Sequence, residues 1–285
     1  MERRVIRQAA VAGSFYPASR EGLLALIEEC FTGHLGPRSV PSVSYDPAQK
    51  TLGLVSPHAG YVYSGPCAAH GFARAAQAGL FETVVVVGPN HRGWGAAVAI
   101  HPPGEFVTPL GTMVIDEGST ASLSSSCSLC VLDEAAHRAE HSVEVQIPFL
   151  QRVWGEKTPK LVAILIAEQR VDVALELGRA IARTFQDRPV LLIASTDFTH
   201  YRPRALAEKQ DKFALDKIVS LDPVGLMQEV TRHSISMCGC GPVAAMLEAC
   251  KRLGCGQAEL LNYVNSGEVT GDFSDVVSYA SVAVT

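Results

Sequence analysis

Short apolar runs alternate with patterns of helical period along most of the chain. Four runs are nearly uncharged and rich in branched side chains, as is typical of strands buried on both faces of a sheet. They lie at residues 51–56, 83–87, 160–166 and 189–194. Helical patterns are expected at residues 66–77, 171–185, 204–220, 222–232 and 241–253. This alternation predicts an α/β fold whose central sheet is largely parallel or mixed, with helices on both faces.

The remaining segments complete the prediction. Ser19 is expected to cap a first helix that ends near Phe31, and a loop rich in Gly, Pro and Ser follows at residues 32–50. A β-rich stretch is expected at 96–115, a helix at 142–154, and closing strands at 259–264 and 276–284. No shift in composition marks a boundary, so residues 1–285 are predicted to form one domain.

Composition and charge exclude some classes of function. The net charge is −5 and no segment is rich in Lys or Arg, which disfavours binding to nucleic acid or to an anionic membrane. The N-terminus lacks the apolar core of a signal peptide, and the apolar runs are too short to cross a bilayer. We therefore expect a cytoplasmic protein whose eight cysteines are thiols or metal ligands rather than disulfides.

Polar residues follow three of the predicted strands. His58 comes after the first strand, His91 after the second, and Asp197 and His200 after the strand at 189–194. Ligands of open α/β sheets bind beyond the carboxyl ends of the strands. If these strands are parallel neighbours, the four side chains converge at one edge of the sheet.

Two further clusters contain side chains that can bind a metal. His137, His141 and Glu144 have spacings that could place them on one face of a helix, although this pattern alone is a weak signal. Cys238 and Cys240 precede a predicted helix, whose N-terminus is expected to lower the pKa of a thiol. A zinc site that combines this pair with the C-x-x-C pair at 127–130 is an alternative.

Six motifs, taken together and in order, resemble those of the Memo family. They are AGSFYP at 12–17, PHAGY at 57–61, GPNH at 88–91, HSVE at 141–144, STDFTHY at 195–201 and CG at 238–239. Bacterial and archaeal members are often called protein B of the AmmeMemoRadiSam system. The resemblance covers almost the whole chain, which makes a chance match of six ordinary motifs improbable.

The resemblance implies a fold like that of the class III extradiol ring-cleaving dioxygenases, which hold Fe(II) with two histidines and one carboxylate. It implies that His58, His91 and Cys238 are the metal ligands here, while leaving open whether Cys240 takes the place of Cys238. A thiolate in place of a carboxylate suits iron, copper(I) or zinc, so ring cleavage does not carry over directly. Asp197 and His200 are expected in the pocket, with His200 as an acid–base group.

Three functional hypotheses follow. The first is a metalloenzyme that acts on a small organic substrate and uses His200, Asp197, His141 and Glu144 in catalysis. Fe(II), or else copper, would serve dioxygenase-like or other redox chemistry, whereas zinc would indicate Lewis-acid or hydrolytic chemistry. The second is a binding or adaptor protein that keeps the pocket without turnover, and the third is a metal-dependent hydrolase. The family resemblance also implies association with an AMMECR-type protein and a radical SAM enzyme.

Overall fold

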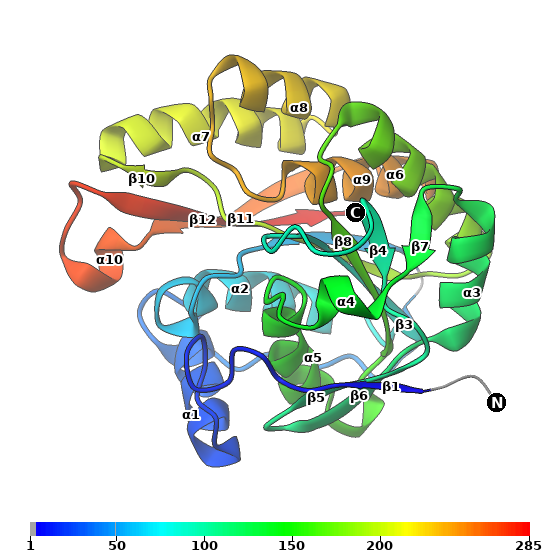
Figure 1. Ribbon diagram of the computed structural model, residues 1–285. Coiled ribbons are helices and arrows are strands. Elements are labelled where there is room, and N and C mark those ends of the chain that lie inside the picture. The colour runs from blue at the N-terminus through cyan, green and yellow to red at the C-terminus, as the bar shows by residue number, and fades with distance from the viewer. Residues whose placement is uncertain (1–3, 49) are drawn as a thin grey trace.

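The computed structural model describes residues 4–48 and 50–285, and one mixed sheet runs through this part of the chain (Figure 1). It contains nine strands, eight of which lie side by side while the ninth, β11 (Ala258–Asn265), pairs with β12. The eight are, in spatial order, β10 (His200–Arg202), β12 (Val276–Val284), β2 (Leu52–Ser56), β9 (Leu191–Ser195), β3 (Thr83–Pro89), β8 (Lys160–Ile166), β4 (Val98–Ile100) and β7 (Cys130–Leu132). A separate three-stranded sheet is formed by β1 (Val5–Arg7), β5 (Gly104–Thr108) and β6 (Gly111–Val114).

The centre of the large sheet is parallel. Strands β2, β9, β3 and β8 all run in the same direction, whereas β12 and β4 are antiparallel to their neighbours β2 and β8. Ser56 at the end of β2 lies opposite Ser195 at the end of β9, so the carboxyl ends of these strands meet at one edge. This arrangement confirms the predicted mixed α/β sheet and the adjacency of the three strands that precede the polar motifs.

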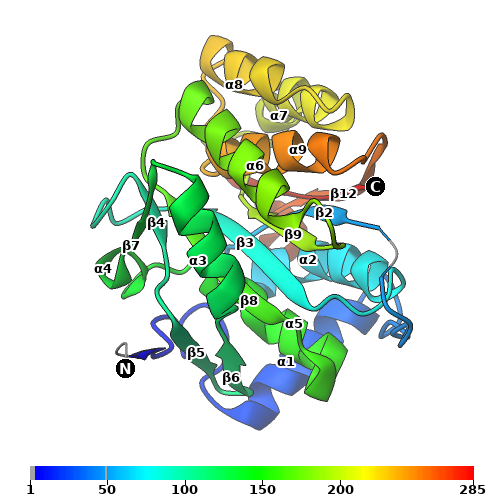
Figure 2. The same ribbon diagram turned by 90° about the vertical axis from the view of Figure 1, so that its right-hand side faces the viewer.

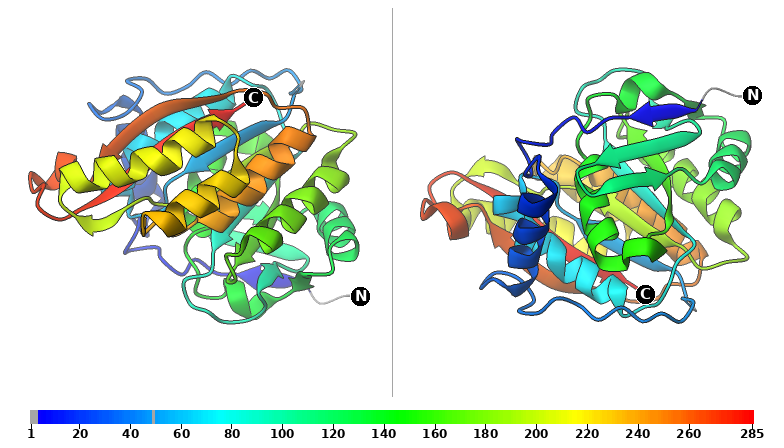
Figure 3. Two further views of the ribbon diagram at one scale, coloured as in Figure 1. Left: turned by 90° about the horizontal axis from the view of Figure 1, so that it is seen from above. Right: turned by 90° about the horizontal axis from the view of Figure 1, so that it is seen from below.

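The alternation of side chains along the central strands creates two cores, one on each face of the sheet. In β3, Val85 and Val87 point to the core that packs against α6 (Val171–Phe185) and α9 (Cys240–Arg252), while Val84 and Val86 point to the other. The second core packs against α1 (Arg20–Thr32), α2 (Tyr61–Ala76) and α5 (Ile147–Trp154). Figures 2 and 3 show these two helical layers on opposite sides of the sheet.

The other helices are α3 (Glu117–Ser126), α4 (Glu134–His137), α7 (Arg204–Val219), α8 (Pro223–Arg232), α10 (Gly267–Thr270) and two short 3₁₀ turns, η1 (Glu144–Gln146) and η2 (Gly155–Lys157). Three of these helices, α3, α7 and α8, add buried side chains to the core on the α6 and α9 side of the sheet. Helices α3, α4 and α10 and strands β1, β7 and β10 were not predicted from the sequence. Most of these are only three or four residues long, too short for a periodic pattern.

Two predicted boundaries near the polar motifs are wrong. Helix α2 begins at Tyr61, five residues before the prediction, because the Gly60 carbonyl accepts hydrogen bonds from the amides of Tyr63 (2.9 Å) and Ser64 (3.1 Å). Pro66 therefore lies inside the helix. The helical hydrogen bond that it cannot donate is the one to the carbonyl of Val62, an exposed residue. The helix predicted at 142–154 is a 3₁₀ turn followed by α5, so its first residues are not α-helical.

The predicted cap and loop near the N-terminus can also be compared. The Ser19 side chain accepts from the Gly22 amide at 3.2 Å and caps α1 as expected. Residues 33–48 contain neither helix nor strand, while residue 49 of the predicted loop lies outside the described residues. In the described part of the chain, every helix falls short of the length and apolarity needed to cross a bilayer.

Candidate metal centre

Three histidine rings meet at the carboxyl edge of the sheet. His58 follows β2, His91 follows β3, and His141 comes from the loop between α4 and η1. The ring centroids are 5.1 Å apart for His58 and His91, 5.3 Å for His58 and His141, and 4.6 Å for His91 and His141. One ring nitrogen from each lies within 4.8 Å of the other two, and no other group of three metal-binding side chains among the described residues meets this condition.

Each of these imidazoles is oriented by a protein group at Nδ1. His91 Nδ1 lies 2.9 Å from Glu140 Oε1, and His141 Nδ1 lies 3.4 Å from the same oxygen. His58 Nδ1 lies 2.9 Å from Ser195 Oγ, whose own proton is donated to the Ser142 carbonyl at 2.6 Å. His58 Nδ1 and His91 Nδ1 therefore act as donors, which leaves Nε2 of these rings available to a metal, while His141 Nδ1 faces Glu140 at ion-pair distance.

Glu140 is the residue of this site that the sequence did not reveal. Its buried carboxylate also accepts from the amides of His91 (2.7 Å), His141 (2.9 Å) and Ser142 (2.9 Å). Burial alone would raise the pKa of Glu140, but the hydrogen bonds from His91 and Ser142 and the neighbouring imidazoles lower it to about 2. One carboxylate thus orients two histidines at once, and its only sequence signal is its position next to His141.

The protonation state of the cluster suits a metal ion. Burial lowers the pKa of His58 far below its usual value, and it lowers that of His141 to about 4. Both rings are therefore neutral at pH 7, the form that binds metals. The exposed fraction of the side chain rises from 2% for His58 to 16% for His141 and 31% for His91, so the cluster opens to solvent beside His91.

Cys238 is the cysteine that faces the cluster. Its Sγ lies 3.2 Å from His58 Nε2 and accepts from the Asp197 amide at 3.2 Å. Cys240 instead donates to Gln169 Oε1 at 3.3 Å, which directs it elsewhere. The expectation that the helix N-terminus lowers the thiol pKa is wrong, because burial, aided by the Asp197 carboxylate, raises the pKa of Cys238, and burial also raises that of Cys240.

Asp197 and His200 lie beside the cluster, as the strand ends predicted. Asp197 Oδ1 accepts from the His58 amide at 2.8 Å, and its Oδ2 lies 4.0 Å from His58 Nε2. Burial raises the pKa of Asp197 to about 6 despite these hydrogen bonds. His200 begins β10 and its Nδ1 is bound to the Ser236 carbonyl at 2.9 Å, which leaves its Nε2 without a protein partner among the described residues.

Glu144 is held in a different set of contacts. It forms a buried ion pair with Arg7 and accepts from the Tyr16 hydroxyl and from the amides of Ala10 (2.9 Å) and Val11 (3.1 Å). These contacts attach the N-terminal segment to the domain, and they favour a structural role for Glu144 over the expected catalytic one.

The alternative groupings suggested by the sequence do not form. Helix α4 ends at His137, whose Nε2 lies 3.3 Å from the Ala99 carbonyl, so His137 and His141 do not share a helix face. The four-cysteine zinc site is also wrong. Cys127 directly follows α3 and Cys130 begins β7, and the two form no metal-binding group with the cysteine that faces the histidines.

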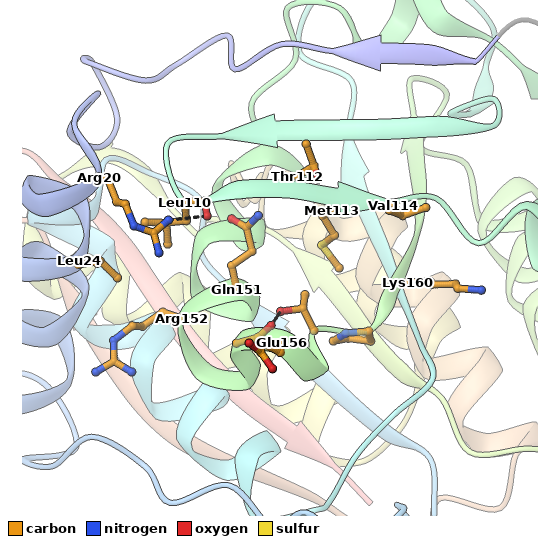
Figure 4. Close-up of a pocket in the computed structure, with 13 residues that line it drawn as sticks. Arg20, Leu24, Leu110, Thr112, Met113, Val114, Gln151, Arg152, Glu156 and Lys160 are labelled. Atoms are coloured by element: carbon orange, nitrogen blue, oxygen red, sulfur yellow. Dashed lines mark hydrogen bonds between the residues drawn. The ribbon is translucent and has the colours of Figure 1, made fainter.

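A groove elsewhere on the surface is separate from the histidine cluster. It has a volume of about 680 Å³, lies between α1, β6 and α5, and is drawn in Figure 4. Its lining combines Arg20, Arg152 and Lys160 with apolar side chains such as Leu24 and Met113, and includes no histidine or cysteine. It therefore has no metal-binding chemistry comparable to that of the sheet edge.

The fold and the cluster define an α/β protein with a three-histidine site that could bind a metal ion. A profile described as Memo-like protein matches residues 7–283. The chain is 46% identical over 279 residues to a MEMO1 family protein of Methanopyrus kandleri, covering 97% of this chain and 98% of that protein. It is 42% identical over 280 residues to a MEMO1 family protein of Ignicoccus hospitalis, covering 98% of both. The chain belongs to the Memo family, as its motifs indicated.

The fold is also similar to a solved structure of low sequence identity. The crystal structure of the uncharacterized protein JW3007 from Escherichia coli K12 matches with a TM-score of 0.55 and 12% identity. The match covers 83% of this chain and 100% of that one. At this identity the likeness shows a shared fold alone.

Proposed function

We propose that the protein is a non-haem metalloenzyme that acts on a small organic substrate by dioxygenase-like or other redox chemistry. Fe(II) is the proposed ion, with copper as the redox-active alternative, because imidazole suits both. Zinc, which has no redox chemistry, would instead support Lewis-acid or hydrolytic chemistry at the same ligands. The ligands are His58, His91 and His141 through Nε2, and Cys238 is a further donor beside His58.

The observation that carries the proposal is the shared orientation of the three imidazoles. Nδ1 of His58 and Nδ1 of His91 are hydrogen-bonded to protein groups, Nδ1 of His141 faces Glu140 at 3.4 Å, and one ring nitrogen of each lies within 4.8 Å of the others. An outer group that fixes the tautomer and direction of a histidine is a recurrent feature of metal sites. Cys238 Sγ, 3.2 Å from His58 Nε2, lies where a cation would stabilise its thiolate form.

A bound ion would supply Lewis-acid and one-electron chemistry at this point. The protein's own contribution is to hold the rings in place, exclude water around His58, and move protons. Asp197 is suited to proton transfer because its pKa is raised by burial to about 6, close to neutrality. His200 is the second proton carrier, since its Nδ1 is fixed by the Ser236 carbonyl and its Nε2 remains available.

Elemental analysis of anaerobically purified protein tests the proposal. We expect about one metal ion per chain in the wild type, and a strong loss in His58→Ala, His91→Ala and His141→Ala. His34→Ala, at an exposed position in the loop after α1, is the matched control and should keep its metal. Metal-free wild type that remains folded would instead favour the adaptor hypothesis, in which partner binding is insensitive to chelation.

The family resemblance adds the proposal that this protein works together with an AMMECR-type protein and a radical SAM enzyme. Co-expression and affinity purification of the three proteins from one organism would test it. Recovery of neither partner, together with a gene that stands apart from both, would contradict the association.

A further inference from the structure

The loop that follows β3 is rigidly built at the open side of the histidine cluster. The Asn90 side-chain Nδ2 donates to the Trp94 carbonyl at 2.7 Å, and its Oδ1 accepts from the backbone amides of Arg92 (3.2 Å) and Gly93 (2.9 Å). Gly93 has a φ of 66°, which a tight turn of this kind requires. Asn90 thus fixes the backbone of Arg92 directly beside His91, the most exposed ring of the cluster.

The Arg92 side chain extends toward the segment that carries His141. Its Nε donates to the Ala139 carbonyl at 3.3 Å, and after burial and His91 its charge contributes to the lowered pKa of His141. Among the described residues no carboxylate forms an ion pair with it, although the side chain is exposed. Arg92 is therefore an unpaired cation at the mouth of the site.

The geometry of a guanidinium narrows what it can bind. With Nε committed to the Ala139 carbonyl, both terminal nitrogens remain as donors in one plane. Such a fork matches the two oxygens of a carboxylate or phosphate. On the cluster itself, the half-buried ring of Phe15 is centred 4.6 Å from that of His141. A cation and an aromatic ring thus each contact the segment that carries His141.

We infer that Arg92 binds an oxyanion group of the substrate, a carboxylate or a phosphate, while the rest of the substrate reaches the histidine cluster. The inference rests on the proposed metalloenzyme function and names its substrate class: an anion with an aromatic or apolar body. Arg92 acts in recognition, and the chemistry takes place at the histidines.

Calorimetric titration of the metal-loaded protein under anaerobic conditions tests this assignment. The probes are 3,4-dihydroxybenzoate and its neutral counterpart 3,4-dihydroxybenzamide, with phenyl phosphate to distinguish a phosphate from a carboxylate. Wild type should prefer an anionic probe to the amide. In Arg92→Gln, the affinity for whichever anionic probe the wild type binds more tightly should fall about threefold to tenfold. The range is modest because the side chain is exposed to solvent. Affinity for the amide should be unchanged.

Two controls separate this inference from the proposal on which it depends. Arg74→Gln removes a cation from the last turn of α2, at the opposite end of that helix from the cluster, and should behave as wild type. Metal content is measured on every sample, because a wild type that holds no metal would refute the proposed metalloenzyme function. A metal-loaded wild type without preference for either anion, or an Arg92→Gln variant that keeps the full preference, would refute the role of Arg92 alone.

Discussion

Glu140→Gln is the substitution that most directly tests how the histidine cluster is held. The change preserves shape and removes the charge that two imidazoles share. Glu140 Oε1 receives His91 Nδ1 and the amides of His141 and Ser142, while Oε2 receives the His91 amide. All of these neighbours are donors. An amide nitrogen placed at either position would face at least one N–H and leave it unsatisfied.

The size of the effect follows from this geometry. Loss of an outer carboxylate weakens metal affinity by about 10-fold to 100-fold, which corresponds to about 1.4–2.7 kcal/mol. In the metal-free protein, the folded pKa of about 2 against a reference of 4.5 implies a contribution to stability of about 3 kcal/mol at neutral pH. Because the folded pKa of Glu140 is lowered, this contribution is complete above pH 4.5 and is lost as the pH falls toward about 2.

Two assays measure these quantities. Competition with a chelator gives metal affinity at pH 7, and urea unfolding of the metal-free wild type and variant gives their difference in stability at pH 7 and pH 3. The difference should shrink at the lower pH. Glu134→Gln, in the first turn of α4, is the matched control and should alter neither result. Wild-type metal affinity in Glu140→Gln would refute the reasoning.

Four other substitutions have separable outcomes. Glu144→Gln breaks a buried ion pair and should destabilise the protein by about 3–5 kcal/mol in denaturant unfolding, yet the refolded variant should keep its metal. Cys238→Ser should weaken metal binding whereas Cys240→Ser should not, so equal effects would argue against the assignment of the facing thiol. Gly88→Ala would place a Cβ 2.4 Å from Ser142 Oγ, so the segment that carries His141 should shift and metal affinity should fall. Metal affinity equal to that of the wild type would contradict this.

The parts of the fold that the sequence predicted are those with a strong local pattern. The run of valines in β3 and the apolar runs of β2 and β9 specify buried strands, and their parallel pairing follows from the helices between them. Because His58 and His91 directly follow two of these strands, their meeting at one edge was predictable.

The rest of the site depends on contacts between distant segments. His141 reaches the cluster from a loop whose course is set by α4 and η1, both too short to leave a periodic pattern. The role of Glu140 exists only because β3 brings His91 within hydrogen-bond distance. The raised pKa of Cys238 likewise comes from tertiary burial, which outweighs the local effect of the helix N-terminus.

The most direct test of the central claim is X-ray absorption spectroscopy on protein loaded with one equivalent of zinc. The account predicts imidazole scattering from three rings with nitrogen at about 2.0–2.1 Å. It also predicts one sulfur at about 2.3 Å that disappears in Cys238→Ser. A spectrum with only oxygen neighbours, or one that is unchanged by His58→Ala and His141→Ala, would contradict a metal centre at the edge of the sheet.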